Sequence, residues 1–139
     1  MFSPNKSETG AQLPWEYMPV AAGTYVAGQL LNAAEGSLAP VSEASNTTPG
    51  YLCMANITAA EGDIVPVTRV SKNHIYETKL SAAAEGAGIG TKLRVSAGGL
   101  QADAGAAGTF EVTYIEGTTA GSAVDGRFIE ERGGQLICL

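Results

Sequence analysis

The chain carries few side chains with which it could do catalytic or metal chemistry. His74 is its only histidine, and Asn73 and Tyr76 beside it form no recognised nucleophile or metal-binding pattern. A histidine at the start of a strand is the simpler interpretation. Neither Cys53 nor Cys138 has nearby histidines with which to complete a zinc or non-haem iron site. The sequence therefore predicts no catalytic residue, no metal ligand, no cofactor-binding residue and no enzymatic activity.

The two cysteines are also too few for a disulfide framework. We expect both Cys53 and Cys138 to be reduced thiols that serve as small core side chains. A single bridge between them stays an alternative, because their spacing in the chain does not fix the distance between them.

The carboxylates are not arranged as a catalytic pair. Glu130 and Glu131 are adjacent, so on a strand they point to opposite faces and do not share a substrate. Asp63, Asp103 and Asp125 fall singly in turns near glycines, where such side chains bond to the local backbone. Weak Ca²⁺ binding at one of these turns is the alternative.

One glycine-rich segment, Gly86 to Lys92, has the composition of a phosphate-binding loop but not its pattern. Lys92 and Thr91 stand in the wrong order, and the flanking elements are not a strand followed by a helix. We interpret the segment as a turn.

Length and charge narrow the class of protein further. The chain has 139 residues, about one domain, and 45% of them are hydrophobic, although its aromatic residues are only three Phe, one Trp and five Tyr. The formal net charge of −6 argues against nucleic-acid or anionic-membrane partners, since those need clustered Lys and Arg. We see neither a secretory signal nor an apolar run that could cross a bilayer, so we expect the protein to stay where it is made.

The elements that must position these side chains are short strands. Apolar and polar residues alternate in residues 92–96 and 109–114, which is the period of a half-buried strand. Glycine-rich turns separate these runs from each other and from a third at residues 123–129. Further strands are expected at residues 24–31, 37–41, 51–57, 63–70, 74–80 and 135–138. About nine short strands at regular spacing predict an all-β fold, a small antiparallel β-barrel or sandwich.

Two details refine this expectation. Pro66 cannot donate to a central ladder, so we place the strand at residues 63–70 at an edge or a bulge. The strand alternation predicts a core of eight apolar side chains: Val26, Leu30, Leu93, Val95, Phe110, Val112, Tyr114 and Phe128.

The tetrapeptide Ala-Ala-Glu-Gly occurs at residues 33–36, 59–62 and 83–86. A short alanine-rich turn closed by a glycine with positive φ can redirect the chain between strands. The alternative is that an alanine- and glycine-rich composition produces the matches by chance. Their irregular spacing argues against a solenoid.

Residues 1–19 differ from the rest of the chain. Pro14 and Pro19 bias the segment toward extended conformations, so we predict an extended N-terminal arm before a barrel or sandwich domain at residues 20–139. The arm carries the only tryptophan, Trp15. Either Trp15 and Tyr17 fold back as a lid over one end of the barrel, or the arm docks on another subunit or a neighbouring protein, because aromatics and methionine are typical interface anchors.

Several runs of the sequence resemble the small head-decoration and head-fibre proteins of tailed bacteriophages. The resemblance extends from residue 20 to about residue 131 and rests on a strand-and-turn pattern. The runs that carry it are Gly23–Leu31, Gly62–Val67, Gly90–Ser96, Gly99–Ala104, Thr109–Gly117 and Gly126–Phe128. It implies a β-rich protein without catalysis that coats the outside of the capsid shell, commonly as a trimer.

The residues and the resemblance lead to one functional hypothesis: a non-enzymatic capsid decoration protein, a cement or head fibre, that binds the outer surface of a phage head and stabilises or decorates it. Its partners would be the major capsid protein and further copies of the chain, with a trimer favoured, and neither nucleic acid nor membrane. It would be made in the host cytoplasm and reside on the capsid exterior of the virion. We expect five residues of the arm to provide the capsid or subunit contact: Phe2, Leu13, Trp15, Tyr17 and Met18.

Two other classes of function remain as alternatives. A virion-displayed carbohydrate-binding or adhesive module would need an exposed aromatic platform, with two of Tyr25, Tyr51, Tyr76 and Tyr114 facing solvent together. A small hydrolase using ordinary carboxylates would need a pocket in which polar groups converge.

Overall fold

The computed structural model describes residues 1–7, 14–34, 36–41, 48–104 and 108–129. In these residues the chain forms strands and turns and no helix, so the predicted all-β fold is confirmed. Thirteen strands are found there: β1 (Ser3–Ser7), β2 (Glu16–Pro19), β3 (Gly23–Tyr25), β4 (Leu30–Ala34), β5 (Ser37–Pro40), β6 (Tyr51–Cys53), β7 (Ile57–Ala59), β8 (Ile64–Arg69), β9 (His74–Lys79), β10 (Lys92–Val95), β11 (Ala102–Asp103), β12 (Phe110–Ile115) and β13 (Ala123–Phe128).

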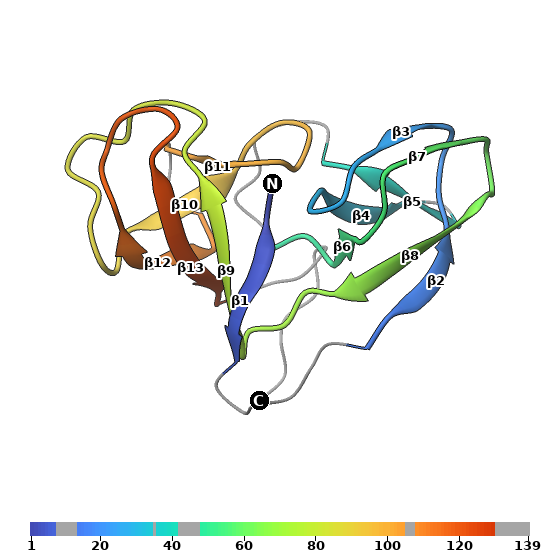
Figure 1. The fold of residues 1–139 in the computed structure, drawn as a ribbon, viewed down its shortest axis with the longest axis horizontal. Helices are drawn as coiled ribbons and strands as arrows, with labels where there is room; N and C mark the ends of the chain where they lie inside the picture. Colours follow the sequence, from blue (N-terminus) through green and yellow to red (C-terminus); the bar gives the residue numbers. More distant parts are fainter. Residues whose placement is uncertain (8–13, 35, 42–47, 105–107, 130–139) are drawn as a thin grey trace.

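The strands form two main sheets that lie in separate lobes (Figure 1). A five-stranded sheet has the order β2-β8-β6-β4-β5, and a six-stranded sheet has the order β1-β9-β13-β12-β10-β11. A two-stranded sheet of β3 and β7 accompanies the first. Neighbouring strands are antiparallel in all of them.

The two lobes repeat one topology. We call residues 16–70 the first unit and residues 74–129 the second unit. Taken in chain order, β2, β4, β5, β6 and β8 of the first unit match β9, β10, β11, β12 and β13 of the second, and each strand has the same neighbours as its counterpart. Strand β1 is an addition on the outer edge of β9.

The match extends to the register of the strands. Leu31 lies opposite Tyr51 in the first unit. At the corresponding place in the second unit, Leu93 lies opposite Phe110. The other pairings agree in the same way, so each residue of a strand has a definite counterpart in the other unit.

Each unit also curls until its outer strands meet. Val20, directly after β2, forms a parallel bridge with Leu38 in β5. Leu80, directly after β9, forms the same bridge with Ala102 in β11. The register of the repeat and this closure together make each unit a small, strongly curved sheet with its own interior.

The repeated tetrapeptide forms turns, as predicted. Gly36, Gly62 and Gly86 have φ angles of 89°, 87° and 77°, a region that favours glycine. The structural repeat follows a different spacing, however. The counterpart of Gly62 is Gly121, with a φ of 85°, and the amides of both donate to the residue that forms the parallel bridge.

The core has two clusters. One lies inside the first unit and contains Val20, Tyr25, Leu31, Leu38, Cys53, Ala59, Val65 and Val67. The other fills the second unit and continues between the units, where side chains from the outer face of the first unit, such as Leu30 and Leu52, join it. The two units therefore share buried surface.

Phe2 joins the two units. Its N–H donates to the carbonyl of Gly28 in the first unit at 2.8 Å. Its ring packs in the second unit, 5.5 Å from the ring centre of Phe110 and 6.1 Å from that of Phe128. A side chain only 1% exposed at this place fills the space between the lobes.

Most of the predicted core is confirmed, with two corrections. Leu30, Leu93, Val95, Phe110, Val112 and Phe128 are buried. Val26 is only half-buried, and Tyr114 is 57% exposed. The register of β12 against β13 shifts between Val112 and Tyr114, and a bulge of this kind reverses which face the following residues point to.

The predicted strand boundaries also need correction. Residues 24–31 form two strands and not one, because the chain turns at Gly28, where φ is 91°. Residues 51–57 are likewise divided between β6 and β7. The strand expected at residues 135–138 lies outside the described residues.

Pro66 does not mark an edge, since β8 lies between β2 and β6. Its carbonyl accepts from the amide of Met54, just after the end of β6, at 3.0 Å. The backbone nitrogen of Pro66, which has no hydrogen to donate, points in the same direction as this carbonyl. The sheet accommodates the proline there without losing a central ladder bond.

Candidate interaction surface

The structure separates the five residues predicted to make a partner contact. Phe2 is in the core, and we therefore remove it from the proposed contact. Leu13 lies outside the described residues. Trp15 and Tyr17 are exposed, at 55% and 65%, while Met18 is half-buried and packs against the core of the first unit.

The extended conformation expected for the N-terminal segment is found at β1 and β2, and both strands are paired. Ser3–Ser7 pairs with β9, and Glu16–Pro19 pairs with β8. The domain boundary at residue 19 stays a prediction. What the structure adds is that Tyr17 lies in the outer strand of the first unit and Trp15 directly precedes it.

Tyr17 belongs to an apolar surface on the outer face of β2 and β8, and the exposed Trp15 directly precedes β2. The other face of this pair is the interior, because Met18 lies opposite the buried Val65. Residues alternate along a strand, so Tyr17 points outward, as does Ile64 in β8, which is 55% exposed. We call Trp15, Tyr17 and Ile64 the aromatic surface.

Strand β2 also has an open edge. Between Glu16 and Pro19 it pairs with β8 alone among the described residues. In Figure 1 it lies on the side of the first unit that faces away from the second. Pro19 suits such an edge, because it has no N–H to leave without a partner.

An ion pair fixes β2 to β8 beside this surface. The Nε and Nη2 atoms of Arg69 donate to the two carboxylate oxygens of Glu16 at 2.8 and 3.3 Å. These hydrogen bonds lower the pKa of Glu16 and raise that of Arg69. The guanidinium also lies over the ring of Tyr51, 5.5 Å from its centre.

Sequence reasoning found Trp15 and Tyr17 but not Ile64 or Arg69. The signal for Ile64 was present, since apolar residues alternate in β8 with Val65 and Val67 facing inward. Only the register against β2 shows that Ile64 lies on the same face as Tyr17.

The side chains considered for chemistry have structural surroundings. His74 begins β9 and is buried. Cys53 is a free, fully buried thiol whose Sγ donates to the carbonyl of Ala55 at 3.2 Å, and burial raises its pKa. The possible partner Cys138 lies outside the described residues. No group of three potential metal ligands occurs in the part of the chain that is described.

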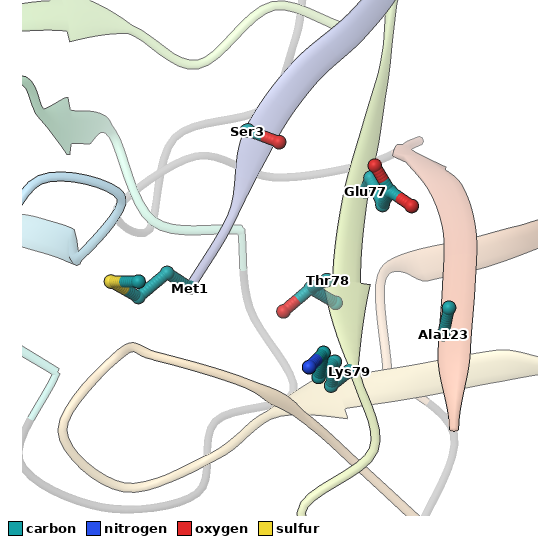
Figure 2. Close-up of a pocket in the computed structure, with 6 residues that line it drawn as sticks. All are labelled: Met1, Ser3, Glu77, Thr78, Lys79 and Ala123. Atoms are coloured by element: carbon teal, nitrogen blue, oxygen red, sulfur yellow. The ribbon is translucent and has the colours of Figure 1, made fainter. Parts of the chain in front are cut away.

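A cavity of about 330 Å³ lies between Met1 and strand β9. Figure 2 shows Met1 and Ser3 on one side and Glu77, Thr78 and Lys79 on the other. The pKa of the Met1 α-amino group is lowered, first by desolvation and then by the charge of Lys79. This open groove contains one carboxylate beside two amines, so we place the candidate site at the aromatic surface instead.

The tyrosines named for a carbohydrate platform do not form one. Tyr25 and Tyr76 are buried, and Tyr51 is half-buried under Arg69. Tyr114 is exposed, but it lies in the second unit. An aromatic platform in the described residues would therefore have to be Trp15 with Tyr17.

No helix in the described residues is long and apolar enough to span a bilayer. Comparison with known proteins places the chain in no family: no family model matches it, and no curated protein is significantly similar to it.

Proposed function

We propose that this chain is a non-enzymatic decoration protein of a phage head, which binds the outer surface of the capsid shell and stabilises or decorates it. The observation that carries the proposal is the aromatic surface. Three large apolar side chains exposed together are typical of a protein–protein contact, whereas single exposed ones are ordinary. Tyr and Trp are also enriched among the residues that dominate binding free energy.

The support of this surface also favours a binding role. Tyr17 is carried by a strand held in register with β8 and tied to it by the pair of Glu16 and Arg69, and Trp15 directly precedes that strand. Contact residues on a rigid element lose less conformational entropy on binding than residues on a free arm. The aromatic surface is thus held ready for a partner.

The partners in this proposal are the major capsid protein and further copies of the chain, and the place is the exterior of the virion. The acidic net charge of −6 favours a protein partner over nucleic acid or an anionic membrane. A curved β unit with polar turns adds contact area to a shell without requiring a reaction.

The proposal is tested with purified phage heads that lack the protein. Wild-type chain should co-sediment with them and raise the temperature at which they release DNA. The double variant W15S/Y17S should bind at least about thirtyfold more weakly, because truncating interface anchors costs about 2 kcal/mol or more.

Tyr114→Ser is the matched control, since Tyr114 is comparably exposed but stands outside the aromatic surface. It should bind heads like the wild type. The proposal fails if wild-type chain does not bind heads, and the aromatic surface is not the contact if W15S/Y17S binds as tightly as Tyr114→Ser.

A virion-displayed carbohydrate-binding module is the second candidate. The observation that favours it is that Trp15 and Tyr17 stand two residues apart in the chain and are both exposed, as the side chains of a sugar-stacking platform must be. Binding of wild type but not W15S/Y17S to a glycan array, without binding to heads, would select this function over decoration.

A further inference from the structure

We propose that β2 is the contact between two copies of this chain, which pair β2 to β2 in antiparallel fashion across a two-fold axis. This inference goes beyond shell binding and does not rest on it. It follows from the direction of the backbone groups of β2, from what covers the equivalent edge in the second unit, and from the sequence of the strand itself.

The backbone of Tyr17 faces away from the sheet. The amide of Val20 donates to the carbonyl of Asp63. Backbone groups alternate in direction along an antiparallel strand, so the N–H and C=O groups of Val20, Met18 and Glu16 point toward β8. The N–H and C=O groups of Tyr17 therefore point to the opposite side. Its partner Pro66 gives the same result, because the Pro66 carbonyl is bonded to Met54 and not to β2. The Tyr17 N–H and C=O thus point out of the open edge.

The second unit shows what such an edge accepts. Tyr17 corresponds to Glu77 in β9, since the two occupy equivalent places in the β2–β8 and β9–β13 pairings. Glu77 has the antiparallel strand β1 beside it, with Ser3 directly opposite. An antiparallel strand therefore fits along this edge as far as the position that Glu77 and Tyr17 share, and β2 lacks the strand that β9 has among the described residues.

The sequence of β2 makes a second copy a fitting occupant. In a pairing centred on Tyr17, that residue exchanges two hydrogen bonds with Tyr17 of the second copy. Trp15 then lies opposite Pro19 of the second copy, where the Trp15 N–H donates to the Pro19 carbonyl and the return bond is missing, because proline has no N–H. Glu16 brings no unbalanced charge, because its carboxylate is already paired with Arg69.

This pairing uses the strand edge and leaves the outer face uncovered. Trp15, Tyr17 and Ile64 of the two copies become one continuous apolar face that crosses the two-fold axis. The dimer therefore doubles the aromatic surface. The contact itself is small, so we expect a dissociation constant on the order of 10 μM, weaker than for a standard interface of about 1,600 Å².

Sedimentation velocity without any phage particle tests the pairing, so its outcome is separate from that of head binding. Over a concentration series the mass should rise from 14.2 kDa toward twice that value. Tyr17→Pro removes the outward N–H and should weaken dimerisation at least tenfold. The matched variant Tyr17→Ala keeps the N–H and should retain most of it.

Hydrogen exchange of the wild-type chain gives a second measurement, which is needed if Tyr17→Pro does not fold. The Tyr17 amide should exchange more slowly at high than at low protein concentration, while the Met18 amide, which faces β8, should not change. A chain that stays monomeric, a discrete trimer, a dimer that survives Tyr17→Pro, or a Tyr17 amide insensitive to concentration would each overturn the proposal.

Discussion

The equivalent outer faces of the two units differ in polarity: the face of the first unit is buried, and that of the second unit is charged and partly exposed. In the first unit, Leu30, Leu52 and Thr68 form a row across β4, β6 and β8, and all three are buried. The row lies against the second unit, and its leucines belong to the shared core. Because the face is covered, its side chains must leave no polar group unpaired: the two leucines are apolar, and the Thr68 hydroxyl donates to Met54 Sδ at 3.9 Å.

In the second unit, the register puts Lys92, Glu111 and Arg127 in the same row. Arg127 donates to the Glu111 carboxylate at 3.4 Å, and both side chains are partly exposed. Repeat proteins need a polar outer face on their terminal units to stay soluble. One fold thus carries an apolar face where the other unit covers it and a charged face where no described residue covers it.

The interiors differ in a related way. At one end of its interior the second unit has an aromatic cluster of four side chains: Phe2, Tyr76, Phe110 and Phe128. The positions equivalent to the last three hold Glu16, Tyr51 and Arg69 in the first unit. In the second unit these positions are apolar, and the Phe2 ring packs against them. In the first unit they hold the ion pair of Glu16 and Arg69.

The strongest test of this contrast moves a charge between the equivalent rows. Leu52→Glu should destabilise the chain by about 4 kcal/mol, because it buries a carboxylate without a partner. The reverse change at the equivalent position, Glu111→Leu, should alter stability by less than about 1 kcal/mol. Urea unfolding measures both, and equal effects would mean that the two faces are not differently covered.

A smaller effect is expected from removing the side chain that joins the units. Phe2→Ala should cost about 3 kcal/mol, since it empties a buried aromatic site. The exposed neighbour Ser3 offers the control Ser3→Ala, which should be near neutral. Thermal unfolding compares the two, and a Phe2→Ala variant as stable as Ser3→Ala would show that the ring does not hold the lobes together.

The smallest effect concerns the ion pair of Glu16 and Arg69. The Arg69 hydrogen bond lowers the pKa of Glu16, so the pair stabilises the fold above the ordinary carboxyl pKa and stops doing so as pH falls through the lowered value. Arg69→Gln should raise the Glu16 pKa, and Arg69→Lys should raise it less. NMR titration of the Glu16 carboxyl measures this, and an unchanged pKa in Arg69→Gln would contradict it.

Much of the fold could be predicted from residue alternation. The strands at residues 37–41, 63–70, 74–80, 92–96, 109–114 and 123–129 have close counterparts in the structure. Alternation failed at Tyr114, because one extra residue in β12 reverses the faces and no sequence signal marks it. Strand prediction was thus accurate where pairing is regular.

The partner-contact prediction was limited by a different cause. Trp15 and Tyr17 were recognised from their residue type, and both are exposed. Phe2 has the same apolar character but is buried, because strand β1 inserts between the lobes. Residue type alone does not distinguish an anchor for a neighbouring molecule from an anchor within the chain.

The internal repeat was hidden for a related reason. The tetrapeptide at residues 33–36, 59–62 and 83–86 suggested repetition, but its copies do not occupy equivalent places. Gly62 matches Gly121, and the tetrapeptide is not conserved between those two turns. What the units share is hydrogen-bond register, and that is a property of paired backbones.

The buried thiol of Cys53 gives the first unit a built-in reporter. A maleimide reagent needs a solvent-exposed thiolate, and Cys53 offers neither exposure nor ready deprotonation while the unit is closed. In a Cys138→Ser background, the labelling rate of Cys53 would therefore equal the opening rate of this unit when labelling of the open state is fast, and would be proportional to the equilibrium constant of opening when labelling is slow. Local opening of the first unit could then be measured separately from opening of the second.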